Sequence, residues 1–183
     1  MTDQFQTYIT FHTKGAQSPT NADLKYYNLL KAWTVKKDHD FAMLRSHAGT
    51  TALQDPGKRD AIKARIAKDL QNAKNFLLII EKTADTDTEW VSFEICCAVD
   101  RCRLPVIAAY IKYDYVLAPN FLSNTWPAAL SERIDNKTAH VIHIPFKKEP
   151  IKTALNQFYP SNRPAGSLSH YQEDIYRKWG IIK

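Results

Sequence analysis

The stretch Phe76-Leu77-Leu78-Ile79-Ile80 decides the fold, because it is a continuous apolar run with no polar position. A strand that is buried on both faces has this pattern, and such strands belong to parallel sheets covered by helices. A second apolar run follows at Pro105–Tyr110. The two runs predict a central sheet with a helical layer on each side.

Segments with strand and helix character alternate along the rest of the chain. β-branched and aromatic residues mark strands, and apolar residues at helical spacing mark helices. Further strands are expected at Thr7–His12, Asp40–Leu44 and Ala139–Ile144. Helices are expected at Asp23–Trp33, Lys58–Ala73, Thr86–Arg103, Glu149–Phe158 and Tyr171–Trp179, with a short helix after Pro127. This alternation predicts an α/β, flavodoxin-like three-layer sandwich with a central parallel five-stranded sheet, whose ligands bind at the carboxyl ends of the strands.

Length and composition indicate one domain of ordinary globular character. The 183 residues are 44% hydrophobic and 24% charged, which is typical of globular proteins. We expect a domain at residues 1–160 and a C-terminal extension at 161–183 that docks on it. The net charge of +6 is spread over dispersed lysines and arginines. Such an excess favours anionic ligands, including nucleotides, but is not itself evidence of nucleic-acid binding, and no nucleic-acid partner is expected. No signal peptide or membrane-spanning stretch is recognisable, which predicts a cytoplasmic protein with no membrane partner.

The three cysteines, Cys96, Cys97 and Cys102, lie close together on one expected helix. Their odd number and their spacing do not suit a disulfide framework, so reduced thiols are expected. No pair of histidines accompanies them at zinc-ligand spacing, and we therefore expect no metal site.

Several common α/β families are disfavoured by missing motifs. The chain has no G-x-x-x-x-G-K-[ST] loop, no G-x-G-x-x-G after the first strand and no G-x-S-x-G elbow. No pair of acidic residues closes the first strand, as a phosphoacceptor site would require. A P-loop nucleotidase, an ordinary Rossmann dehydrogenase, an α/β-hydrolase and a receiver domain are therefore disfavoured.

The helix after the strand at 76–80 carries the most informative polar residue, Glu94. Val91, Ile95 and Ala98 form the face expected to pack on the sheet, and Glu94 lies at its edge. Trp90 precedes Glu94 by four residues, so the two side chains lie on one side of the helix. We expect Glu94 to be partly desolvated and to reach a cleft at the carboxyl edge of the sheet.

These residues resemble the TIR domain pattern. The resemblance consists of the apolar strand at 76–80 followed by Trp90-Val91-Ser92-Phe93-Glu94, of the opening strand Tyr8-Ile9-Thr10-Phe11-His12, and of the later strand Pro105-Val106-Ile107. It covers residues 7–111 and extends more loosely to Phe158. Bacterial stand-alone TIR-like proteins, such as the TIR subunit of Thoeris anti-phage defence, are the most similar members.

The resemblance implies cleavage of the nicotinamide–ribose bond of NAD, with Glu94 as the catalytic carboxylate. NAD is then the substrate, and no separate cofactor is expected. The product is ADP-ribose or a cyclic derivative that signals to a downstream effector, and the enzyme is expected to form a homo-oligomer. The expected substrate-binding residues are Phe11, His12, Arg45, His47 and Trp90. Phe11 and His12 are expected to face the same crevice as Glu94, and Arg45 to pair with the pyrophosphate.

Simpler interpretations of these residues remain open. Glu94 would be an ordinary surface carboxylate if it paired with a cation such as Arg101. Trp90 would be a packing anchor, Phe11 a core residue, and His12 a partner in a structural hydrogen bond. At the level of the protein, a non-enzymatic TIR-like scaffold that self-associates and recruits a partner is the alternative function. A deoxyribosyltransferase-like nucleoside enzyme of related topology is the third.

Overall fold

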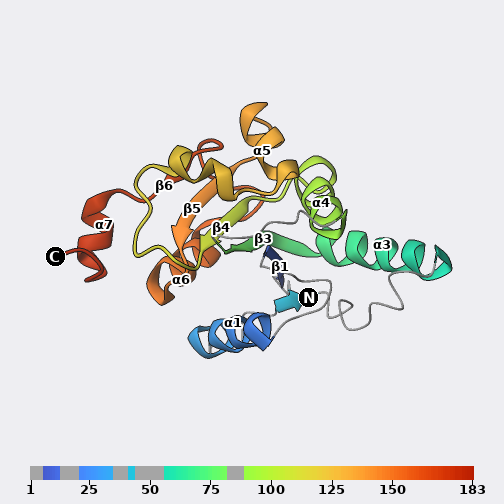
Figure 1. Ribbon diagram of the computed structural model, residues 1–183, viewed down its shortest axis with the longest axis horizontal. Helices are drawn as coiled ribbons and strands as arrows, with labels where there is room; N and C mark the ends of the chain where they lie inside the picture. The colour runs from blue at the N-terminus through green and yellow to red at the C-terminus, as the bar shows by residue number, and fades with distance from the viewer. Residues whose placement is uncertain (1–5, 13–20, 35–40, 44–55, 82–88) are drawn as a thin grey trace.

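The computed structural model describes residues 6–12, 21–34, 41–43, 56–81 and 89–183 (Figure 1). Its centre is one parallel sheet with the strand order β2-β1-β3-β4-β5-β6. The strands are β1 (Gln6–His12), β2 (Phe41–Met43), β3 (Ala73–Ile80), β4 (Val106–Tyr110), β5 (Val141–Pro145) and β6 (Ser169–His170). All five predicted strands are confirmed, and the two-residue β6 extends the sheet beyond β5.

Helices cover both faces of the sheet, as predicted for a three-layer sandwich. One layer contains α1 (Asn21–Trp33) and α6 (Lys148–Gln157), and the other contains α3 (Pro56–Gln71), α4 (Glu89–Cys96) and α5 (Ala128–Asp135) (Figure 1). The remaining helices of the described residues are the 3₁₀ helix η3 (Pro119–Thr125), the π-helix η2 (Cys97–Arg101) and α7 (Glu173–Lys178). The order in which strands are added to the sheet reverses between β1 and β3, which is the flavodoxin-like arrangement.

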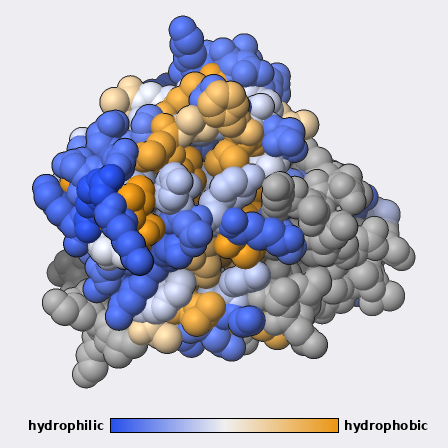
Figure 2. Space-filling model, turned by 60° about the vertical axis from the view of Figure 1, so that its left-hand side comes forward, coloured by the Kyte–Doolittle hydropathy of each residue, from blue (hydrophilic) through white to orange (hydrophobic). Residues whose placement is uncertain are grey.

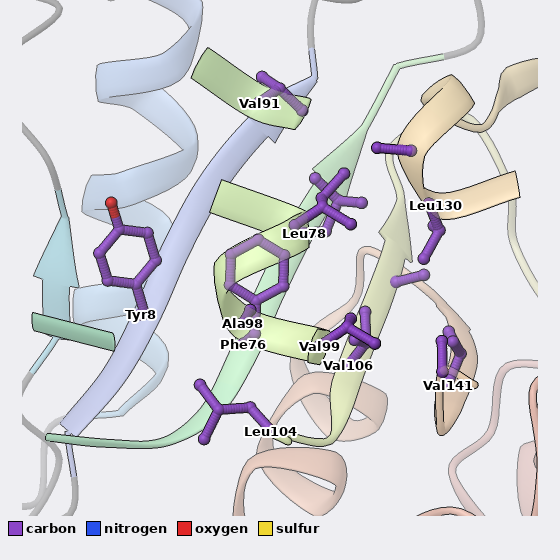
Figure 3. Packing of buried hydrophobic residues seen from close by; sticks show 14 of the residues in the cluster. Tyr8, Phe76, Leu78, Val91, Ala98, Val99, Leu104, Val106, Leu130 and Val141 are labelled. Atoms are coloured by element: carbon purple, nitrogen blue, oxygen red, sulfur yellow. The ribbon is translucent and has the colours of Figure 1, made fainter. Parts of the chain in front are cut away.

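Two hydrophobic clusters fill the spaces between the sheet and its helices. Strand alternation sends Phe76 and Leu78 of β3 toward α3, α4 and α5, and sends Leu77 and Ile79 toward α1 and α6. Figure 3 shows Phe76 and Leu78 among side chains from α4 and β4. All four are fully buried. The unbroken apolar run of β3 is therefore explained by its two covered faces.

The helix predicted from Thr86 to Arg103 has a more complex form. Its expected first residues, 86–88, lie outside the described residues. After Cys96 the α-helix continues as a π-turn, in which the amide of Cys102 donates to the carbonyl of Cys97 at 3.0 Å. Arg103 then adopts a left-handed backbone conformation, with φ of 52°. The wider turn shifts the helical register after Glu94, a local change that simple helical periodicity cannot predict.

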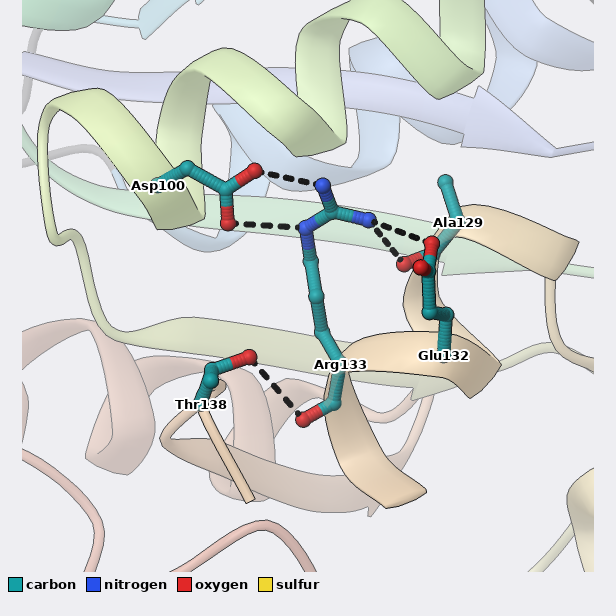
Figure 4. Close-up of polar contacts among 5 residues, drawn as sticks. All are labelled: Asp100, Ala129, Glu132, Arg133 and Thr138. Atoms are coloured by element: carbon teal, nitrogen blue, oxygen red, sulfur yellow. Dashed lines mark hydrogen bonds and ion pairs between the residues drawn. The ribbon is translucent and has the colours of Figure 1, made fainter. Parts of the chain in front are cut away.

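An arginine fork connects the π-turn with α5. Arg133 donates from Nε to Asp100 Oδ1 at 2.9 Å and from Nη2 to the other oxygen of the same carboxylate (Figure 4). Its Nη1 donates to the carbonyl of Ala129 at 2.8 Å. Bidentate pairing of this kind adds geometric specificity to the charge attraction. It therefore sets the position of η2 relative to α5.

The C-terminal residues pack on the far edge of the sheet. Ser169 and His170 pair with Ile142 and His143 of β5, and Tyr176 of α7 is fully buried. Figure 2 shows a face on which small groups of hydrophobic side chains are separated by hydrophilic ones. The expected boundary between a domain at residues 1–160 and a C-terminal extension at 161–183 stays a prediction.

A buried polar chain joins β4, β5 and the segment before β6. His143 Nε2 lies 2.9 Å from the carbonyl of Ser167, which can only accept, so Nε2 carries the proton and Nδ1 accepts from Tyr110 Oη at 2.7 Å. Tyr110 Oη in turn accepts from Trp126 Nε1 at 2.7 Å. Burial lowers the pKa of His143 to about 4. The ring is therefore a neutral structural link at neutral pH.

Asn75 fastens α6 to the sheet from a fully buried position in β3. Its Oδ1 accepts from Thr7 Oγ1 at 2.7 Å, and its Nδ2 donates to the carbonyls of Phe158 at 2.9 Å and Leu155 at 3.4 Å. The carbonyls at the end of a helix have no partner within the helix. The buried side-chain amide of Asn75 supplies that partner in place of water.

Replacing Asn75 should therefore destabilise the fold strongly. In Asn75→Ala the hydroxyl of Thr7 and the final carbonyls of α6 lose a buried partner, and we expect a loss of about 2–4 kcal/mol in the free energy of unfolding. Thr7→Val removes only one bond of the set and should lose about 1 kcal/mol. Urea denaturation measures both. An Asn75→Ala chain as stable as wild type would contradict this role.

Candidate functional site

The carboxylate of Glu94 is buried between α4 and β1. The residue is 1% exposed. Its Oε1 accepts a hydrogen bond from Tyr8 Oη at 2.8 Å, and its Oε2 accepts one from Thr10 Oγ1 at 2.6 Å. Each carboxylate oxygen is thus held by a different hydroxyl group from the same strand.

Local structure explains why the two hydroxyls converge on one side chain. Tyr8 and Thr10 are two residues apart in β1, so strand alternation turns both toward the face covered by α4. The Tyr8 ring stacks on Phe76 of the neighbouring strand, with 5.9 Å between ring centroids. Val91 and Ile95 of α4 belong to the same hydrophobic cluster. Their burial presses α4 onto the sheet and brings Glu94 with it.

Electrostatics at Glu94 are dominated by loss of solvent. Burial raises the pKa of its carboxyl group to about 7, and the hydrogen bonds from Thr10 and Tyr8 act in the opposite direction. Burial and the neighbouring carboxylate hold the pKa of Tyr8 well above its ordinary value, so its phenol remains a proton donor. No ion pair to Glu94 exists within the described part of the chain.

Glu94 therefore differs from both sequence-based interpretations. The alternative of a surface carboxylate paired with Arg101 is wrong, because the side chain is buried and bonded to two hydroxyls. Glu94 was expected to be partly desolvated, but it is fully buried, because the side of α4 that carries it packs inward. Neither of two surface hollows lined by described residues borders Glu94: one lies on α1, and the other, of about 410 Å³, lies between η2 and the start of β5.

Trp90 lies one helical turn before Glu94 and is 8% exposed. It belongs to the hydrophobic cluster, and the guanidinium of Arg59 lies 5.9 Å from the centre of its ring. Arg59 also forms an ion pair with Glu89 at the start of α4. These contacts give Trp90 a packing role between α3 and α4; contact with a substrate stays a prediction.

The other predicted site residues are divided between the two faces of the sheet. His12 is buried, and strand alternation places it on the same face as Tyr8 and Thr10. Phe11 packs instead against the cluster under α1 and α6. The expectation that Phe11 faces the same side as Glu94 is therefore wrong, because adjacent strand residues point to opposite faces. Arg45 and His47 lie outside the described residues.

Tyr8 and Thr10 are the site residues that sequence analysis missed. Both belong to the quoted opening strand, but there they were used only as strand formers. The available signal was a pair of hydroxyl residues at spacing i, i+2 in a strand that neighbours the one preceding Glu94. That signal becomes specific only when the facing helix and its register are known.

The described residues contain no group of three or more His, Cys, Asp or Glu side chains arranged to hold a metal ion. Within the same part of the chain, no helix combines the length and the apolar character that crossing a membrane requires.

The raised pKa of Glu94 predicts a pH-dependent stability difference. Between about pH 4.5 and about 7 the folded chain keeps a proton that the unfolded chain releases, so this contribution to stability is complete below pH 4.5 and is lost as pH rises to 7. Glu94→Gln removes the effect. We expect this variant to gain stability over wild type as pH rises, by about 3 kcal/mol above pH 7. Denaturation of both proteins from pH 5 to 8 measures the difference, which should not be constant.

Comparison with known proteins identifies the family of this sequence. The sequence profile described as Thoeris protein ThsB, TIR-like domain, matches residues 8–115, which is more than half of the chain and includes Tyr8, Thr10 and Glu94. A crystal structure of a conserved protein from Enterococcus faecalis V583 is similar at a TM-score of 0.42 and 16% identity, over 94% of this chain and 95% of that one. A likeness of that degree carries no weight for function. The match of the profile shows that this chain belongs to the family of Thoeris ThsB TIR-like domains.

Proposed function

We propose that this protein cleaves the bond between nicotinamide and ribose in NAD, with Glu94 as the catalytic carboxylate. The observation that carries the proposal is the burial of Glu94 with hydroxyl donors on both oxygens and with no cation to neutralise it among the described residues. Structural carboxylates are mostly exposed or paired with cations. A desolvated carboxylate with a raised pKa is typical of functional sites.

One carboxylate is sufficient for this reaction. The nicotinamide of NAD is cationic, so it departs with the electron pair of the glycosidic bond and needs no proton. The ribose carbon then becomes oxocarbenium-like, as in glycoside hydrolysis. An anionic Glu94 stabilises that positive charge and accepts hydrogen bonds from ribose hydroxyls. No separate cofactor takes part.

The second half of the reaction decides the product. If water attacks the ribose carbon, it loses one proton and ADP-ribose forms. If a nitrogen of adenine or a ribose hydroxyl attacks, a cyclic product forms. With its pKa near 7, Glu94 is suited to accept the proton of an attacking hydroxyl at neutral pH.

Because Glu94 is 1% exposed, a ribose reaches it only when the side chains that cover it move apart. Such a requirement fits an enzyme whose activity is controlled, for example by assembly of several copies. In this proposal the protein is a cytoplasmic sensor in bacterial anti-phage defence. It forms homo-oligomers and signals to an effector through its small-molecule product.

The test is consumption of NAD by the purified chain, alone and under conditions that force assembly. We expect wild type to release nicotinamide and Glu94→Gln to lose roughly 100-fold or more of that rate, since the anion that stabilises the transition state is absent. Mass spectrometry of the second product distinguishes ADP-ribose from a cyclic form.

Glu89→Gln is the matched control. Glu89 is an exposed carboxylate of the same helix that pairs with Arg59 and Lys63, and its loss should leave NAD consumption near the wild-type rate. Equal inactivity of wild type and Glu94→Gln under all conditions would favour the scaffold function. Cleavage of free nucleosides with NAD left intact would favour the deoxyribosyltransferase-like function.

A further inference from the structure

We propose that Tyr8 and Thr10 are positioning residues that hold the Glu94 carboxylate as an anion in one fixed orientation. This inference rests on the proposed function, because it concerns how the catalytic carboxylate is prepared for the reaction. Neither residue needs to touch the substrate. Both act through Glu94, from the same strand and at the opposite oxygens of one carboxylate.

The geometry restrains the carboxylate in two directions. A single hydrogen bond would leave the carboxylate free to rotate about its last side-chain bond, a torsion with a broad energy minimum. Bonds of 2.8 Å to Oε1 and 2.6 Å to Oε2 fix both oxygens at once. Because Tyr8 is anchored by its ring against Phe76, the donors themselves are held in place by the sheet.

The hydroxyl pair also selects the charge state. When Glu94 is ionised, each oxygen accepts one hydroxyl proton. When Glu94 is protonated, one of its oxygens becomes a donor and one hydroxyl loses its acceptor. The pair therefore favours the anion and opposes burial, which favours the neutral acid. Tyr8 remains protonated because its own pKa is raised well above the ordinary value.

Charged neighbours do not provide this preference in the described part of the chain. The direct contributions to the ionisation of Glu94 are burial and the two hydroxyl bonds. The Glu89 carboxylate on the same helix is neutralised by Arg59 and Lys63, and Arg133 of α5 is bound to Asp100. The other titratable or charged groups on α4 and the elements packed around it are His12 on β1, Lys58, Asp60, Arg65, Lys68 and Asp69 on α3, Cys96 on α4, Cys97 and Arg101 on η2, and Glu132 and Asp135 on α5.

The test compares pH profiles of NAD cleavage by wild type, Thr10→Val and Tyr8→Phe. Each variant removes one hydroxyl and nearly preserves the side-chain shape. For wild type we expect kcat to rise with pH through a midpoint near 7. Each variant should move this midpoint upward by about one pH unit, and Thr10→Val should move it further because its bond is shorter. At pH 7 kcat should fall about fivefold or more, with a smaller change in KM.

Two controls separate positioning from general damage to the fold. Thr10→Ser keeps the donor and should keep the wild-type midpoint. Thr7→Val removes a buried hydroxyl from the same strand that bonds Asn75 on the other face, so it should alter stability without moving the midpoint. An unchanged midpoint in both Thr10→Val and Tyr8→Phe would overturn the inference.

A second measurement makes failure of the inference distinguishable from failure of the proposed function. Titration of the Glu94 side-chain carboxyl by carbon-13 NMR reports its pKa without any reaction, and it should show the same upward shifts. A wild-type chain that leaves NAD intact contradicts the proposed function, even if these shifts occur. Cleavage of NAD without any shift in the titration contradicts the role of the hydroxyls alone.

Discussion

The burial of one carboxylate between a helix and the first strand is the constraint around which this face of the protein is organised. Glu94 enters the hydrophobic cluster because Val91 and Ile95 on the same helix pack onto the sheet. A carboxylate is stable in such surroundings only if its oxygens have partners or if it becomes neutral. Tyr8 and Thr10 provide partners for both oxygens, and the raised pKa shows that the compensation for lost solvent is incomplete.

Two other buried polar side chains on the sheet follow a different principle. Asn75 links Thr7 to the end of α6, and His143 links Tyr110 to the carbonyl of Ser167. Both side chains are neutral, and each bond they make joins two elements of the fold. They stabilise the structure when buried because their hydrogen bonds are satisfied. Glu94 differs from them because burial opposes its ionisation, so its charged form is less stable here than in water.

Specific contacts also fix the C-terminal end of α4, the helix that carries Glu94. The π-turn at Cys97–Arg101 widens the helix one turn after the carboxylate, and the fork between Arg133 and Asp100 connects that turn to α5. π-turns inside α-helices are frequent at functional sites. Here the turn and the fork set where α4 ends, and the apolar cluster sets how closely α4 lies on the sheet. Together they determine the position from which Glu94 reaches β1.

The amino-acid sequence by itself determined the layered fold, because the apolar runs of β3 and β4 and the alternation of strands and helices are local patterns that burial on both faces requires. It also singled out Glu94, since a carboxylate near the apolar face of a helix is conspicuous without any coordinates. Only the tertiary structure decided how deeply Glu94 is buried, and that Tyr8 and Thr10 bond it while Phe11 faces away. Those contacts join residues more than 80 positions apart, and they depend on strand register and on helix placement. Neither the strand register nor the helix placement can be predicted from the short-range spacing of residues, because both result from the packing of the whole core.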